Sequence, residues 1–155
     1  MQADTPLQIK TGLRIAKPAP VVFDAIVDPE QMKNYFISKS SGRMAAGDTV
    51  EWGFPEMDLT FPVHVTKVQP GKLVSFTWKN INGNETSVSI TLNAVDESTT
   101  FVEITEGDED QTEAGIQWLK SNTEGWANFL ACLKAWLEFG INLRKGAFDP
   151  SQMPA

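Results

Sequence analysis

The 155-residue sequence has few of the side chains that build disulfides, metal sites and most catalytic centres. It contains one cysteine, Cys132, and one histidine, His64. A single cysteine excludes an internal disulfide and a cysteine-based zinc site, and one histidine cannot form a histidine-rich metal site. We therefore expect Cys132 to be a buried, inert thiol and His64 to lie on the outer face of a sheet. We expect neither a metal nor a cofactor.

Long hydrophobic runs and positive charge are also scarce. No apolar run approaches the ~20 residues that span a bilayer, and the N-terminus lacks the basic and apolar segments of a signal peptide. The chain has 13 Lys+Arg against 20 Asp+Glu, which gives a formal net charge of −7. Nucleic acids and anionic membranes also carry negative charge, so neither is an expected partner. A cytoplasmic protein without membrane insertion is the default expectation.

The common catalytic motifs are missing as well. The sequence contains no nucleophile elbow, no phosphate-binding glycine loop and no dinucleotide fingerprint. The acidic run of Glu106, Asp108, Glu109 and Asp110 does not have the spacing of a calcium loop. Negative charge just before a helix is favourable without any metal. An enzyme is therefore not the favoured class.

What the sequence does contain is a clear period-2 pattern in its first two thirds. Hydrophobic residues make up 41% and charged residues 21% of the chain, an ordinary globular mix. We expect one domain over residues 1–155, with a frayed tail over 146–155. Alternating apolar residues predict six strands, at residues 7–16, 49–54, 59–68, 72–78, 86–95 and 99–107. Short turns between successive strands predict antiparallel pairing, and Pro62 predicts a local edge or bulge.

Helical patterns follow the first predicted strand and fill the final third. Pro18 and Pro20 favour the first turn of one short helix, and Asp28 before Pro29 favours the start of a second, which is expected to carry Met32, Tyr35 and Phe36. A long amphipathic helix is predicted from Thr112 to about Arg144, with a capping box at Asp110 and Glu113 and a kink near residues 121–123. Its apolar stripe carries Trp118, Asn122, Trp126, Phe129, Leu133, Trp136 and Gly140.

This order of elements predicts an α+β fold in which an antiparallel sheet curls around the last helix. The sequence also resembles the C-terminal-domain family of the activator of the 90-kDa heat-shock protein ATPase. The similar stretches are IAKPAPVVFDAIVDPEQMKNYF, VTKVQPGKLVSFTW, TTFVEITEG and GWANFLACLKAWLEFG. The resemblance implies the START-like, birch-pollen-allergen-like (SRPBCC) superfamily. Its helix-grip fold would here be a curved six-stranded sheet on a long C-terminal helix, with two short helices after the first strand.

The resemblance further implies a cavity between the sheet and the long helix. Relatives in the wider superfamily bind lipids, hormones or polyketides there. We therefore expect this protein to bind an apolar, lipid-like or amphipathic small molecule, mainly through burial of apolar area at about 25 cal/mol per Å². The expected lining is Trp52, Phe54, Phe61, Phe76, Trp78, Ile90 and Val102 from the sheet, Trp118, Trp126, Phe129 and Leu133 from the helix, and Tyr35 and Phe36 at the mouth.

Two other functions stay open. One is a stress-linked or chaperone-associated interaction module with a closed core, and the other is a cyclase-like or hydrolase-like enzyme on the same fold. A homodimer through sheet edges is a further expectation. The separate N-terminal domain of the eukaryotic co-chaperone is missing from this sequence, so stimulation of a chaperone ATPase is not expected. The glycines at 115, 125 and 140 are costly in a helix interior. Either close packing of the helix on the sheet or room for a ligand would explain them.

Overall fold

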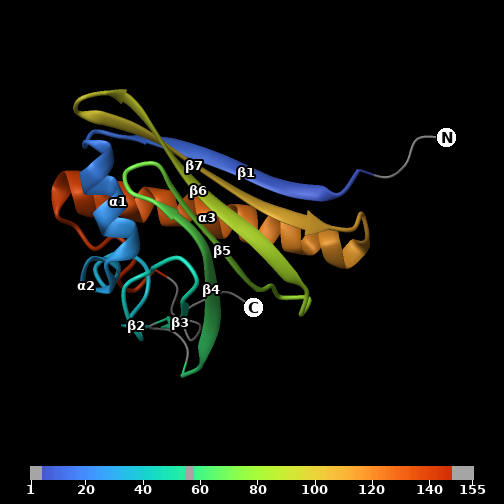
Figure 1. The fold of residues 1–155 in the computed structure, drawn as a ribbon. Coiled ribbons are helices and arrows are strands. Elements are labelled where there is room, and N and C mark those ends of the chain that lie inside the picture. Colours follow the sequence, from blue (N-terminus) through green and yellow to red (C-terminus); the bar gives the residue numbers. More distant parts are fainter. Residues whose placement is uncertain (1–4, 55–57, 148–155) are drawn as a thin grey trace.

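The structure, a computed structural model, describes residues 5–54 and 58–147. Within these residues one antiparallel sheet has seven strands in the order β1-β7-β6-β5-β4-β3-β2. Figure 1 shows this sheet curving around the helices. The elements are β1 (Leu7–Ile15), α1 (Ala19–Val27), α2 (Pro29–Met32), β2 (Lys39–Ser40), β3 (Thr49–Gly53), β4 (Thr60–Gln69), β5 (Leu73–Lys79), β6 (Glu85–Asp96), β7 (Thr99–Glu109) and α3 (Glu113–Phe139).

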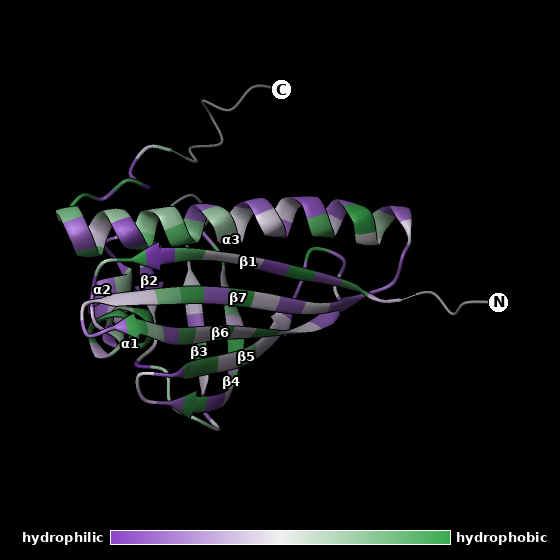
Figure 2. Ribbon diagram, turned by 90° about the horizontal axis from the view of Figure 1, so that it is seen from above, coloured by the Kyte–Doolittle hydropathy of each residue, from purple (hydrophilic) through white to green (hydrophobic). Residues whose placement is uncertain are grey.

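The predicted α+β helix-grip architecture is confirmed, with one more strand than the six expected. The additional strand, β2, contributes only two residues, which pair with Gly53 and Trp52 of β3. A strand of two residues is too short to show an alternating pattern, so periodicity does not predict it. The long helix α3 packs along β1 and β7, and α1 contacts β6, β7 and α3. Figure 2 shows α3 running lengthwise beside β1.

The boundaries of α3 differ from the predicted ones at both ends. Thr112 is the N-cap, and its hydroxyl oxygen accepts the backbone N–H of Gly115, so the capping box predicted at Asp110 is wrong. Gly140 ends the helix because it adopts the left-handed conformation with φ 66°, which glycine takes at little cost. The helix therefore stops before Arg144, and it continues without a break through residues 121–123.

The short helices follow the predicted proline and capping pattern. Pro20 lies in the first turn of α1, and the Asp28 carboxylate caps α2 by accepting the Glu30 N–H at 3.0 Å. The helix α2 ends at Met32, so Tyr35 and Phe36 lie in the turns that follow it rather than on the helix. Both aromatic side chains are buried and join the core.

The sheet opens between β4 and β5, and this opening positions the site. The strands β3 and β4 pair as far as Gly53 and Thr60, whereas β4 and β5 pair only from Gln69 with Leu73 to His64 with Thr77. The last residues of β5, Trp78 and Lys79, therefore pair with β6 alone. Pro62 lies on the part of β4 that β5 does not pair with, as expected of a residue without an N–H donor.

The predicted tail lies mostly outside the described residues, which end at 147. Of the residues expected to be frayed, only Gly146 and Ala147 are described. The backbone N–H of Ala147 donates to the Arg144 carbonyl at 2.9 Å, so these two residues belong to a turn after α3.

Candidate ligand-binding site

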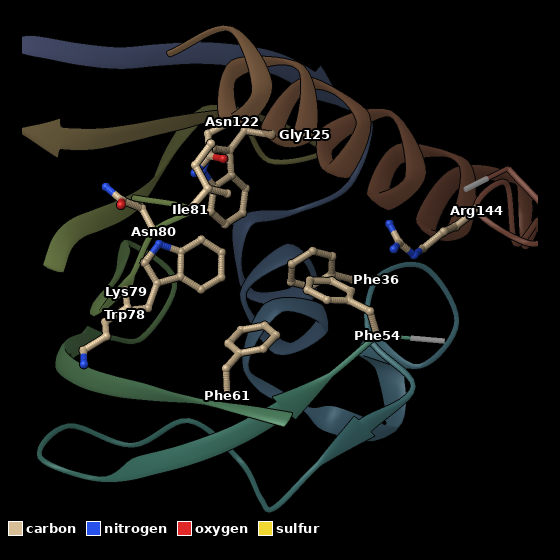
Figure 3. Close-up of a pocket in the computed structure, with 11 residues that line it drawn as sticks. Phe36, Phe54, Phe61, Trp78, Lys79, Asn80, Ile81, Asn122, Gly125 and Arg144 are labelled. Atoms are coloured by element: carbon tan, nitrogen blue, oxygen red, sulfur yellow. The ribbon is translucent and has the colours of Figure 1, made fainter. Parts of the chain in front are cut away.

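A pocket of about 440 Å³ opens where β4 and β5 separate, between the sheet and the middle of α3. This volume is within the ~300–1,000 Å³ range of small-molecule sites. We call it the aromatic pocket. Figure 3 shows its side chains converging from strands, loops and the long helix. It is lined by Phe36, Phe54, Phe61, Trp78, Lys79, Asn80, Ile81, Asn122, Gly125, Trp126 and Arg144.

Aromatic rings form a continuous wall in this pocket. The indole rings of Trp78 and Trp126 stack with centroids 5.6 Å apart and planes 28° apart. Trp78 also contacts Phe61 at 5.8 Å, and Phe61 stacks on Phe54 at 5.5 Å. Phe36 packs edge-on against Phe54 at 5.1 Å. Ring pairs of this kind are rigid and apolar, so the wall offers a preformed surface to an apolar ligand.

The buried carboxylate of Glu106 holds the two tryptophans in place from behind. Its Oε2 accepts the Trp78 indole N–H at 3.0 Å and the Thr86 hydroxyl at 2.6 Å. Its Oε1 accepts the Trp126 indole N–H at 2.8 Å and the Asn122 amide at 3.2 Å. Glu106 is 1% exposed, so these four donors replace the water that a carboxylate would otherwise bind.

The Glu106 bonds connect three strands to the long helix. Trp78 lies on β5, Thr86 on β6 and Glu106 on β7, whereas Asn122 and Trp126 belong to α3. Three of the four donors, Trp78, Asn122 and Trp126, also line the aromatic pocket. Because each indole N–H points at the carboxylate, Glu106 sets the orientation of both ring faces in the pocket wall.

Five of the thirteen predicted ligand-binding residues line the pocket, namely Phe36, Phe54, Phe61, Trp78 and Trp126. The other eight are buried in the core, and the rings of four of them contact rings of the pocket wall. The Phe129 ring contacts Phe36 and Trp126, and the Trp52 ring contacts Phe36 and Trp78. The eight are Tyr35, Trp52, Phe76, Ile90, Val102, Trp118, Phe129 and Leu133.

The sequence reasoning missed Glu106 as part of the site, although a signal was present. Glu106 continues the alternation of Val102 and Ile104, which are fully buried on β7. In the sequence it also belongs to the acidic run before the helix, which hides this alternation. Asp108 and Asp110 of that run are exposed, whereas Glu109 is buried and accepts the side-chain amides of Asn80 and Asn84 at 2.6 and 2.9 Å. These amides lower the pKa of Glu109, with Asn84 contributing most.

Three single residues flagged by the sequence lie away from the pocket. His64 is exposed, as predicted, and its Nδ1 is 2.9 Å from the Thr49 hydroxyl. Cys132 is buried, as predicted, and burial raises the pKa of its thiol, although the charge of Arg144 opposes this. The Tyr35 hydroxyl donates to the Ala25 carbonyl at 2.7 Å, and burial raises its pKa well above the ordinary value. The Cys132 thiol and the Tyr35 hydroxyl are therefore neutral near pH 7.

Comparison with known families identifies the relatives of this chain. Residues 16–138 match the family described as Activator of Hsp90 ATPase homolog 1-like protein. The chain belongs to this family. The match includes both short helices, β2 to β7 and nearly all of α3, so it contains most of the residues around the aromatic pocket. It confirms the resemblance seen in the sequence. A search of the curated proteins finds no significant match.

Solved structures of other proteins share the fold. The protein SSP2350 from Staphylococcus saprophyticus is 30% identical, with a TM-score of 0.78 over 89% of this chain and 96% of that one. An Aha1 dimer from Colwellia psychrerythraea is 24% identical, with a TM-score of 0.72 over 86% of this chain and 98% of that one. DynU16, a protein of the dynemicin biosynthetic locus, is 23% identical, with a TM-score of 0.75 over 86% of this chain and 48% of that one.

A helix that crosses a membrane must be both long and apolar. Among residues 5–54 and 58–147, no helix is both long enough and apolar enough to cross a bilayer. The longest helix, α3, has 27 residues, but polar and charged side chains lie between its apolar ones.

Proposed function

We propose that this protein binds an apolar or amphipathic small molecule in the aromatic pocket. The observation that carries the proposal is the wall of stacked rings around Trp78 and Trp126, held in place by the buried carboxylate of Glu106. A ligand against this wall would gain about 25 cal/mol per Å² of buried apolar area before ordering costs. The rigid wall keeps those ordering costs low.

The chemistry of the pocket supports binding more than catalysis. A general acid or base needs a titratable group within hydrogen-bond reach of the reacting atom. Glu106 is the carboxylate nearest to the tryptophan wall in the described part of the chain, and four donors already occupy its two oxygens. The side-chain amides of Asn80 and Asn122 also line the pocket, where they donate to Glu109 and Glu106 and so form fixed polar edges of the wall.

Filling the pocket from α3 tests this proposal. Gly125 lines the pocket, and a Cβ placed on it would have no heavy atom within 4 Å. We expect Gly125→Leu to fold normally and to occupy ligand space. N-phenyl-1-naphthylamine is a neutral dye that brightens in apolar surroundings. Titration should show one dye per wild-type chain and at least tenfold weaker binding to Gly125→Leu.

The matched control is Ala127→Leu, an exposed position two residues further along the same helix that is not part of the pocket lining. This variant adds similar apolar surface to α3 without filling the pocket, so it should bind the dye as the wild type does. Equal dye affinity in all three proteins would contradict the proposal, because the dye would then be bound elsewhere.

The interaction-module alternative has its own structural observation. Phe139, Ile141 and Leu143, at and just after the end of α3, are 67%, 53% and 51% exposed. Exposed apolar side chains near one another often mark contacts between proteins. Under this alternative the dye would find no specific site, and size-exclusion chromatography or pull-down would show a homodimer or a specific protein partner, such as a chaperone.

A further inference from the structure

A second, smaller pocket adjoins the aromatic pocket and has a different chemical character. It has a volume of about 220 Å³ and shares Phe36 and Arg144 with the aromatic pocket. The two pockets are therefore neighbours, with Phe36 and Arg144 at their boundary. We call it the basic pocket. It is lined by Lys33, Tyr35, Phe36, Ile37, Asn142, Arg144, Lys145 and Gly146.

Positive charge is concentrated around the basic pocket. Three of the chain's 13 basic side chains line it, although the net charge is −7. Of the described residues in its lining, none is Asp or Glu. The Lys33 Nζ lies 3.0 Å from the Glu30 Oε1 in an exposed i,i+3 pair. Exposed pairs of this kind are weak, so Lys33 can turn to another anion.

Arg144 lies at the junction of the two pockets. Its guanidinium carbon is 5.1 Å from the centre of the Phe54 ring, which belongs to the aromatic wall. Figure 3 shows Arg144 on the far side of the pocket from Trp78 and Asn122. The combined site therefore has an aromatic end at the tryptophans, where Lys79 is part of the lining, and a more strongly cationic end beyond Arg144, where Lys33 and Lys145 are added.

We propose that the ligand is an amphipathic anion. Its apolar body lies in the aromatic pocket against Trp78 and Trp126, and its carboxylate or phosphate head lies in the basic pocket near Lys33, Arg144 and Lys145. Charge-assisted hydrogen bonds from lysine and arginine are the usual partners of such heads. This inference rests on the proposed function and adds the charge and orientation of the ligand to it.

A matched series of eight-carbon ligands tests the head-group preference by isothermal titration calorimetry. The probes are octanoate, octyl phosphate, octan-1-ol and octyltrimethylammonium, each below its aggregation concentration. We expect at least one of the two anions to bind at least tenfold more tightly than the alcohol, and the cation to bind more weakly than the alcohol. The anion preference should fall as salt rises, because the head groups are near solvent.

Charge removal locates the head group. The double variant Lys33→Gln/Lys145→Gln should weaken binding of the preferred anion at least fivefold and change octan-1-ol binding less than twofold. The double variant Lys72→Gln/Lys120→Gln removes the same charge at exposed positions outside both pockets, and its affinities should match the wild type. Lys79→Gln removes the cation that lines the aromatic pocket itself, and it should weaken anion binding less than Lys33→Gln/Lys145→Gln does.

The outcomes separate this inference from the proposed function. If octan-1-ol binds as tightly as both anions, or if the cation binds most tightly, the amphipathic-anion inference is wrong and the apolar pocket stands. If Lys79→Gln or the Lys72/Lys120 control loses anion affinity as strongly as the Lys33/Lys145 variant, the basic pocket is not the head-group site. If none of the four ligands binds the wild type, the proposed function itself fails.

Discussion

At the scale of single residues, four of the five tryptophans form two pairs that differ in the partner of the indole N–H, and the fifth, Trp136, donates to Gln31 at 3.1 Å outside the pocket lining. Trp78 and Trp126 donate to Glu106 and line the pocket. Trp52 and Trp118 are almost completely buried, and among the described residues their indole nitrogens have no hydrogen-bond partner. Trp52 and Trp118 therefore contribute through packing alone, whereas Trp78 and Trp126 have a fixed orientation that suits a binding wall.

Replacing Glu106 should disturb both the fold and the wall. Glu106→Gln keeps the shape of the side chain. It replaces one carboxylate oxygen, which accepts two hydrogen bonds, with an amide NH₂ that cannot accept them. We expect a loss of about 2–4 kcal/mol in the free energy of unfolding, because buried donors lose a charged acceptor. Chemical denaturation measures the loss, and tryptophan fluorescence should shift with it.

Glu103→Gln is the matched control for that replacement. Glu103 lies on the same strand, and its side chain is 29% exposed and 3.9 Å from the Lys10 ammonium. Surface pairs contribute little, so this variant should stay within about 0.5 kcal/mol of the wild type. Equal stability losses in the two variants would show that the Glu106 network has no special role.

The individual pocket residues were predictable to different degrees. Strand alternation placed Phe61 and Trp78 on the inner face, and helical periodicity placed Trp126 there. Asn80 and Ile81 follow the end of β5, where no period sets the direction of a side chain. Arg144 lies beyond the end of α3, in a turn whose path depends on tertiary contacts. The sequence therefore indicated the wall of the site but not its polar rim.

At the scale of elements, the glycines of α3 have three different roles. A Cβ on Gly115 would lie 2.0 Å from the Asp110 carbonyl oxygen, so close packing excludes a side chain there. Gly140 ends the helix with φ 66°. Gly125 has open space instead, because it faces the pocket. Close packing thus applies to Gly115 and open space at the pocket to Gly125.

These roles predict opposite effects of alanine on stability. Gly125→Ala should raise the free energy of unfolding by about 0.5–1 kcal/mol, because alanine favours the helix and meets no clash. Gly140→Ala should lower it by about 1 kcal/mol, because alanine disfavours a positive φ. Urea denaturation of both variants measures the difference. A loss of stability in Gly125→Ala would contradict the open space assigned to that position.

The order of elements was the most predictable level of this structure. Six strands, two short helices and one long helix follow from periodicities of 2 and 3.6 residues and from the proline and aspartate signals. The ends of α3 were less predictable, because Asp110, Thr112 and Glu113 offer competing caps within four residues. The separation of β4 from β5 depends on strand register, which the alternation does not specify.

At the scale of the whole molecule, lowered carboxyl pKa values predict sensitivity to acid. The Ala16 backbone N–H, and then Lys134, lower the pKa of Glu138, and Asn84 and Asn80 lower that of Glu109. A carboxyl whose folded pKa lies below its ordinary 4.5 stabilises the protein above that pH. This stability is lost as the pH falls through the lower folded pKa. The free energy of unfolding should therefore decrease from about pH 5 to about pH 3.

A double variant tests which groups cause this decrease. Glu109→Gln/Glu138→Gln should be less stable than the wild type at pH 7 and should lose less stability on acidification. Glu97→Gln/Glu124→Gln, at exposed positions, should keep the wild-type slope. Urea denaturation at a series of pH values measures both slopes. Identical slopes in the two double variants would contradict the assignment of acid sensitivity to Glu109 and Glu138.

A small molecule bound against the Trp78–Trp126 wall would change the surroundings of both indole rings. The most direct test of such binding is a titration of the ¹⁵N-labelled protein with octan-1-ol, followed by the indole N–H resonances of its five tryptophans. We expect concentration-dependent shifts for Trp78 and Trp126, which line the pocket, and little change for Trp118, which is buried and not part of the lining. Unshifted Trp78 and Trp126 resonances at saturating alcohol, or shifts confined to other tryptophans, would contradict binding at this wall.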